Sequence, residues 1–124
     1  MSAHTAAQYA AIEALEHGMP DIAGMCKEYE ARRNLICARL NRMGLTTNVP
    51  NGTFYVFANI TSSGLSSDEF CVRLLEEQKV AIVPGAAFGE SGEGFVRISY
   101  ATSMEDIKEA CARIDAFLET LHND

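Results

Sequence analysis

The segment 83–100, with the sequence VPGAAFGESGEGFVRISY, decides the fold that we predict for this chain. A short apolar run rich in β-branched residues, 80–83, leads into it and is predicted to be a strand that stops before Pro84, since proline cannot donate to a sheet. Four glycines follow within ten residues, at positions 85, 89, 92 and 94. Glycine accepts backbone angles and close approaches that other residues resist, so we expect a tight loop between two strands.

The second strand of this segment is predicted over 95–101 and carries one charge, Arg97, near its centre. Alternation places Val96, Ile98 and Tyr100 on one face of the strand and Arg97 on the other. A buried cation needs an anionic partner, and the planar guanidinium fits a carboxylate best because it donates two parallel hydrogen bonds. The residues alone favour an internal ion pair or a head group in water, and leave a ligand carboxylate as the alternative.

Length and composition indicate one globular domain over 1–124. The chain has 124 residues, of which 48% are hydrophobic and 22% charged, and its net charge is −7. This charge argues against nucleic acid or an anionic membrane as a partner. The sequence shows neither an apolar run long enough to cross a bilayer nor a secretory leader, so we expect a cytoplasmic protein.

The four cysteines, at positions 26, 37, 71 and 111, fall in predicted helices. No two of them have metal-site spacing, and the histidines at 4, 17 and 122 do not cluster with them. We therefore expect reduced thiols in the core or half-buried, with no metal and no disulfide.

The hydrophobic periodicity predicts the order helix-helix-strand-helix-strand-strand-helix. The expected elements are helices over about 5–18, 20–43, 66–79 and 102–121, and strands over 53–58, 80–83 and 95–101. Three helix starts have the spacing of a capping box, at Thr5, Ser66 and Thr102. The fold class is α+β, a small, mostly antiparallel sheet of about three strands covered by amphipathic helices.

Two of the predicted helices carry an apolar stripe that we expect to face the core. The stripe of the long second helix is made by Ile22, Met25, Cys26, Tyr29, Ile36, Leu40 and Met43. That of the last helix is made by Met104, Ile107, Cys111, Ile114, Leu118 and Leu121.

The glycine-rich segment, written P-G-x-x-F-G-x-x-G-x-x-x-x-R-I-S-Y over 84–100, resembles the C-terminal signature of the class I/II pyridoxal-phosphate aminotransferases. These are the aspartate aminotransferase family of fold type I. The resemblance implies that Arg97 grips the α-carboxylate of an amino-acid substrate.

Three further segments resemble the same family. QYAAIEAL at 8–15 is similar to a segment just downstream of the family's cofactor lysine, and YEARRN at 29–34 to its Y-x-x-R-R-D, with Asn34 where aspartate is common. PNGTFYVF at 50–57 is similar to P-x-G-[AT]-F-Y-x-F, whose first aromatic residue borders the substrate pocket. That role is implied weakly for Phe54, with core packing equally open, and core packing is favoured for Phe57.

The family's catalytic parts are not found in the sequence. An aminotransferase needs a Schiff-base lysine for pyridoxal phosphate, whereas Lys27, Lys79 and Lys108 lie among charged residues of predicted helices and outside the lysine motif. The glycine loop leads into a strand, so no helix N-terminus meets a phosphate there. We therefore expect no cofactor on this chain alone and no catalysis by it.

The resemblance runs from about Gln8 to Phe117 and matches only the C-terminal part of the family's enzymes. We expect the chain to be the small domain of a longer aminotransferase, with the catalytic large domain upstream. Met1 would then be an introduced start, with a naturally truncated gene as the alternative. The parent would be a homodimer that binds pyridoxal 5'-phosphate and acts on an amino acid and a 2-oxo acid. The alternatives are a free-standing module that binds a carboxylate or amino acid, and an oligomerisation domain without a ligand.

Overall fold

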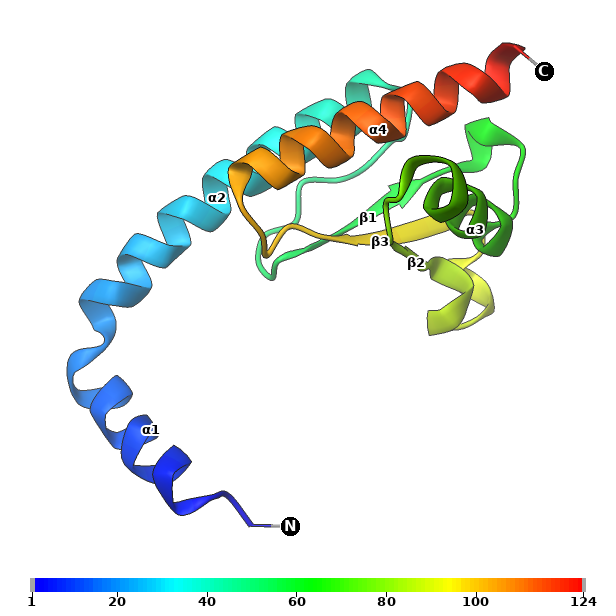
Figure 1. The fold of residues 1–124 in the computed structure, drawn as a ribbon. Coiled ribbons are helices and arrows are strands. Elements are labelled where there is room, and N and C mark those ends of the chain that lie inside the picture. Colours follow the sequence, from blue (N-terminus) through cyan, green and yellow to red (C-terminus); the bar gives the residue numbers. More distant parts are fainter. Residues whose placement is uncertain (1, 124) are drawn as a thin grey trace.

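Residues 2–123 are described by the computed structural model; Met1, the expected introduced start, lies outside them. These residues form four α-helices, and the last three contribute the side chains that cover one face of a small sheet (Figure 1). The elements are α1 (Thr5–His17), α2 (Met19–Arg42), β1 (Tyr55–Asn59), α3 (Ser67–Gln78), β2 (Val83–Pro84), β3 (Phe95–Ser99) and α4 (Met104–Asn123). The predicted order and the α+β class are confirmed.

The sheet has the order β1-β3-β2, and both pairings are antiparallel. Its alternation buries Val56, Ala58, Val96 and Ile98, which form one core with buried residues of α2, α3 and α4. The other face, which we call the open face, carries the residues between them, including Arg97 at the centre of β3. Arg97 is thus on the opposite face from the core residues, as predicted.

The apolar stripe of α4 is the most completely buried helical stripe. Its central residues Ile107, Cys111, Ile114 and Leu118 are all buried, and only the two ends are partly exposed. The prediction that this stripe is core is confirmed.

The stripe of α2 is buried only in its second half, which corrects the prediction. Ile36 and Leu40 lie in the core, whereas Ile22 and Met25 are 47% and 56% exposed. In Figure 1 the first half of α2 projects away from the sheet and carries α1 with it. Cys26 lies on this projecting part and is exposed, contrary to the expected buried or half-buried thiol. Periodicity defines an apolar face, but it does not identify what covers that face.

All three strands differ from prediction at their ends, and β3 stops at Ser99 rather than at Ala101. The strand expected over 80–83 is instead Val83–Pro84, which includes the proline. Proline is tolerated there because β2 is an edge strand, whose outer side needs no donor. β1 begins two residues later than expected, after Thr53, whose φ of 69° is incompatible with an extended strand.

Of the three predicted capping boxes, the one at Ser66 has the expected cap: its hydroxyl accepts from the backbone N–H of Glu69. At α1 the cap is His4 rather than Thr5, and at α4 it is Ser103 rather than Thr102. In both cases a neighbouring residue offers a competing acceptor, so the helix start shifts by one position.

No helix among the described residues is long and apolar enough to cross a membrane.

Candidate carboxylate-binding site

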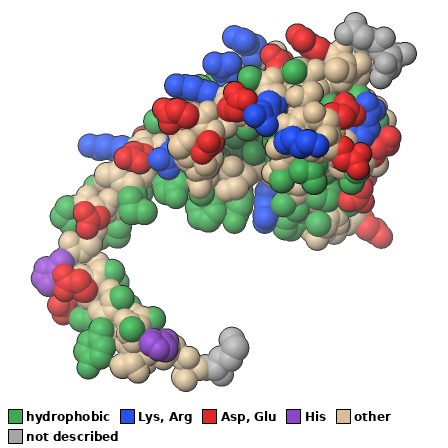
Figure 2. Space-filling model, in the orientation of Figure 1, with side chains coloured by type: hydrophobic (Ala, Val, Ile, Leu, Met, Phe, Trp, Pro, Cys, Tyr) green, Lys and Arg blue, Asp and Glu red, His purple; other side chains and the backbone are tan. Residues whose placement is uncertain are grey.

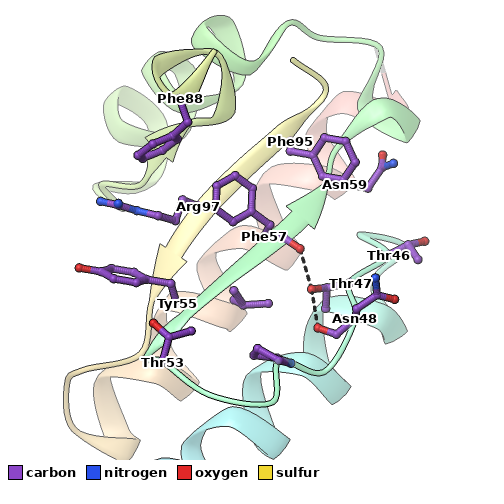
Figure 3. A pocket seen from close by; sticks show the side chains of 12 residues that line it. Thr46, Thr47, Asn48, Thr53, Tyr55, Phe57, Asn59, Phe88, Phe95 and Arg97 are labelled. Carbon is purple, nitrogen blue, oxygen red and sulfur yellow. Dashed lines mark hydrogen bonds between the residues drawn. The ribbon is translucent and has the colours of Figure 1, made fainter. Parts of the chain in front are cut away.

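The glycine-rich loop folds into two short 3₁₀ turns, Gly85–Phe88 and Glu90–Gly92, packed against each other. A Cβ atom built on Gly85 would overlap the carbonyl oxygen of Gly92, so this contact requires glycine on both sides. Gly89, between the turns, has a φ of 118°, which L side chains rarely adopt. The predicted tight loop is confirmed, and it places Phe88 over the open face of the sheet (Figure 3).

The loop is anchored to the first turn of α3. The carboxylate of Glu93 accepts from both the backbone N–H and the hydroxyl of Ser67, each at 2.8 Å. The hydroxyl of Ser67, which is fully buried, also accepts from the backbone N–H of Ala86 at 3.4 Å. The hydrogen bonds from Ser67 hold the pKa of Glu93 below its ordinary value of 4.5. The sequence does not reveal this anchor, because a contact across 26 residues has no local pattern.

Arg97 lies half-buried on the open face, between two aromatic rings. Its guanidinium carbon is 4.3 Å from the ring centroid of Tyr55 and 4.6 Å from that of Phe88. Figure 3 shows these rings on opposite sides of the arginine head group. Within residues 2–123, the ion pairs His17–Glu13, Arg32–Glu28, Arg33–Glu30, Arg73–Glu77 and Arg113–Glu109 do not involve Arg97. The internal ion pair that the residues alone favoured is therefore absent from the described part of the chain.

The groove beside Arg97 has a volume of about 720 Å³. Aromatic side chains from both strands and from the loop line one part of it, and polar residues of 46–48 line the other. The segment 46–48 is held along β1 because the Thr47 hydroxyl donates to the Phe57 carbonyl and the Asn59 N–H donates to the Thr46 carbonyl. Arg97 is the cation of this groove, so an anion that enters it meets a guanidinium with open donors.

Phe57 belongs to this groove, although core packing was the favoured interpretation. It is 41% exposed, pairs in register with Arg97, and its ring meets that of Phe88 edge-on at 5.7 Å. The alternation of β1 could have shown this, since Val56 and Ala58 on either side of it are the inward residues.

Phe54 lies outside the Arg97 groove. Its ring stacks on that of Tyr29 of α2 at 6.1 Å and lines a separate hollow between α2 and the turn that precedes β1. It touches the site only through Tyr55, whose ring centroid is 4.5 Å away. The structure therefore does not bring Phe54 and Arg97 into one pocket.

The lysines lie away from the groove. Lys27, Lys79 and Lys108 are all exposed, and none of them lines it. A site for pyridoxal phosphate needs a lysine amine at the reacting centre, so the residues of this chain do not by themselves fit that cofactor. The described residues also hold no group of three or more histidine, cysteine or acidic side chains suited to a metal ion.

Comparison with known proteins gives one consistent result. The family model "Aminotransferase class I and II" matches residues 1–114. The aromatic-amino-acid aminotransferase 2 of Thermococcus litoralis is 51% identical over 114 residues, which are 90% of this chain and 29% of that protein. The aspartate aminotransferase of Pyrococcus abyssi is 51% identical over 113 residues, again 90% of this chain and 29% of that protein.

A solved structure agrees with these relatives. The crystal structure of an aromatic aminotransferase from Pyrococcus horikoshii superimposes with a TM-score of 0.88 at 48% identity and covers 91% of this chain. The chain corresponds to 31% of that structure, so it spans less than a third of the length of the proteins it matches.

Proposed function

Since this chain belongs to the class I and II aminotransferases, we propose that it is the small C-terminal domain of a pyridoxal-phosphate-dependent enzyme and that Arg97 binds the α-carboxylate of its substrate. The parent enzyme would transfer an amino group from an amino acid to a 2-oxo acid in two half-reactions. The chain supplies the carboxylate-binding arginine. The cofactor, which stabilises the electron pair released at the substrate Cα, and its lysine belong to the upstream large domain.

The observation that carries this proposal is the unpaired guanidinium on the open face of β3. Arg97 lies in a groove, its head group is flanked by rings rather than by acids, and its donors are left for a ligand. A carboxylate can accept two parallel hydrogen bonds from such a fork. Phe54, the weaker predicted site residue, enters the proposal only as a border residue in the adjacent hollow.

The projecting helices support an upstream domain as the partner. Along α1 and the first half of α2 runs a series of large apolar side chains that are 47% to 83% exposed: Tyr9, Ile12, Leu15, Met19, Ile22 and Met25. Figure 2 shows hydrophobic side chains along both helices. An apolar surface of this kind is typical of a protein contact, and the matched relatives are about three times as long as this chain. The proposal assigns the surface to the rest of the enzyme.

Location and assembly complete the proposal. We place the parent enzyme in the cytoplasm, in keeping with the four unpaired thiols of the chain, and propose a homodimer, as the family resemblance implies.

The test is Arg97→Lys in the intact enzyme that carries this chain. Lysine keeps the charge but replaces the bidentate fork with a point donor, so kcat/KM for the amino acid should fall roughly 10- to 150-fold. Arg42→Lys, an exposed position at the end of α2, is the matched control and should leave kcat/KM unchanged. A kcat/KM that Arg97→Lys leaves unchanged would remove Arg97 from the site.

The alternative is a free-standing carboxylate-binding module, and one observation favours it. In this chain, without any other domain, the guanidinium of Arg97 already lies between two rings with its N–H donors available to a ligand. This alternative predicts that millimolar 2-oxoglutarate shifts the NMR amide signals of β3 in the isolated chain, and that Arg97→Ala abolishes the shifts. A concentration-dependent dimer in sedimentation, with no response to 2-oxoglutarate, would instead favour an oligomerisation domain.

A further inference from the structure

We propose that Tyr55 and Phe88 form an aromatic clamp that positions Arg97 for its carboxylate, in place of the acidic partner that a half-buried arginine would otherwise need. Both are positioning residues, since they act through the arginine. The inference rests on the proposed function of Arg97 and adds to it how the guanidinium is held.

The geometry of the clamp comes from two separate parts of the chain. Tyr55 begins β1, and Phe88 ends the first turn of the glycine-rich loop. Their ring centroids lie 4.3 Å and 4.6 Å from the guanidinium carbon of Arg97, on either side of it (Figure 3). Both distances are well inside the range of about 6 Å in which a cation is attracted to a ring face.

The chemistry of the clamp differs from that of an ion pair in one respect. An aspartate or glutamate beside Arg97 would accept its N–H groups and compete with a ligand carboxylate for them. A ring face attracts the charge without accepting these hydrogen bonds in the guanidinium plane, so the fork stays available. The rings also restrict a long side chain that would otherwise lose rotamer entropy when the ligand binds.

Each ring of the clamp is itself supported. Phe88 packs edge-on against Phe57, and its loop is anchored by the hydrogen bonds between Glu93 and Ser67. Tyr55 lies against Phe54, and that ring stacks on Tyr29 of α2. The clamp is therefore fixed from the loop on one side and from the long helix on the other. Phe54 gains a role here as the support of Tyr55.

The experiment measures how strongly the intact enzyme depends on the substrate carboxylate. Single-turnover half-reactions, followed by the absorbance of the cofactor, compare phenylalanine with 2-phenylethylamine and aspartate with β-alanine, pairs that differ by the α-carboxylate. The discrimination ratio is the kcat/KM of the half-reaction with the amino acid divided by the kcat/KM with the compound that lacks the α-carboxylate. Phe88→Leu and Tyr55→Leu should each lower this ratio roughly 3- to 30-fold by loosening the guanidinium. Tyr55→Phe keeps the ring and should retain the ratio.

The outcomes separate the clamp from the function on which it rests. Arg97→Leu should abolish most of the discrimination, and if it does not, the proposed function itself fails. If Arg97→Leu does so while Phe88→Leu and Tyr55→Leu leave the ratio unchanged, the clamp is wrong and the role of Arg97 stands. A fall that is equal for both members of a pair would indicate general damage and would also overturn the clamp.

A second readout needs only this chain. The side-chain N–H of Arg97 should show an upfield NMR shift from the two ring currents, which Phe88→Leu reduces and Tyr55→Phe retains. A signal that Phe88→Leu leaves in place would contradict the clamp regardless of any catalytic result.

Discussion

The two faces of the sheet are made by the same strands, but one face packs into the core and the other forms the groove around Arg97. On the buried face, Val56, Ala58, Val96 and Ile98 contribute only apolar contacts to the core. On the open face, the residues between them form the groove around Arg97, and several of their side chains remain in contact with solvent. Neighbouring positions in one strand can therefore carry either the stability of the domain or its binding chemistry, according to which side of the sheet they face.

The largest expected effect on stability comes from placing a charged residue on the buried face of β3, compared with removing the charge at the adjacent position on the open face. Val96→Asp would bury a carboxylate without a partner and should cost more than about 3 kcal/mol, enough to unfold much of the population. Arg97→Leu, one residue further on the open face, should change the free energy of unfolding by less than about 1 kcal/mol. Urea unfolding followed by circular dichroism measures both, and similar losses for the two variants would contradict the division between the faces.

The next effect concerns the loop that covers the open face. Gly85→Ala would drive a methyl group into the carbonyl of Gly92, so the two turns must separate, at a cost of roughly 2–3 kcal/mol. Gly52→Ala is the matched control, since its Cβ meets nothing within 4 Å and it should be nearly neutral. Thermal melts of the two variants compare them directly, and equal melting temperatures would argue against the close approach of the turns.

A smaller, pH-dependent effect tests the anchor of that loop. The pKa of Glu93 is lowered in the folded chain, so its contribution is present above the ordinary value of 4.5 and is lost as the pH falls through the lower folded value. Glu93→Gln should therefore lose stability at pH 7 and show a weaker decline on acidification. Part of the decline in stability should remain in this variant, because the pKa of Asp106 is also lowered in the folded chain, mainly by its hydrogen bond with the Thr102 hydroxyl.

Urea midpoints between pH 7 and pH 3 check this prediction, with Glu90→Gln in the same loop as the control. An identical pH profile for Glu93→Gln and the unaltered chain would mean that the carboxylate of Glu93 does not hold the loop.

The smallest expected effect on stability concerns the two halves of α2 rather than the two faces of the sheet. Cys26 is exposed on the projecting half, whereas Cys37, Cys71 and Cys111 are buried. Burial, with a smaller contribution from Asp68, raises the pKa of Cys71 to about 11. A thiol reagent should modify Cys26 alone in the folded chain, and Cys26→Ser should remove that reaction with almost no change in stability. Rapid modification of two or more thiols would contradict the burial of this core.

The sequence predicted the fold more fully than the site. Hydrophobic periodicity along the chain was sufficient for the order of elements, and it identified the buried faces of β3 and α4, because period 2 and period 3.6 are properties of the local chain. The same alternation placed Arg97 on the open face. Alternation in β1 could also have placed Phe57 there, but the prediction followed the rule that an aromatic residue in a strand is more often core. The aromatic neighbours of Arg97 and the anchor at Ser67 come from segments far apart in the sequence.

The sequence by itself determined that this chain has a glycine-rich loop, a strand with a central arginine and the C-terminal signature of an aminotransferase. These features are written in contiguous residues, where steric limits on glycine and proline and the alternation of side chains act locally. Only the tertiary structure decided what surrounds Arg97 and which half of α2 is covered. Such contacts depend on how the elements pack against one another, and no local pattern contains that information.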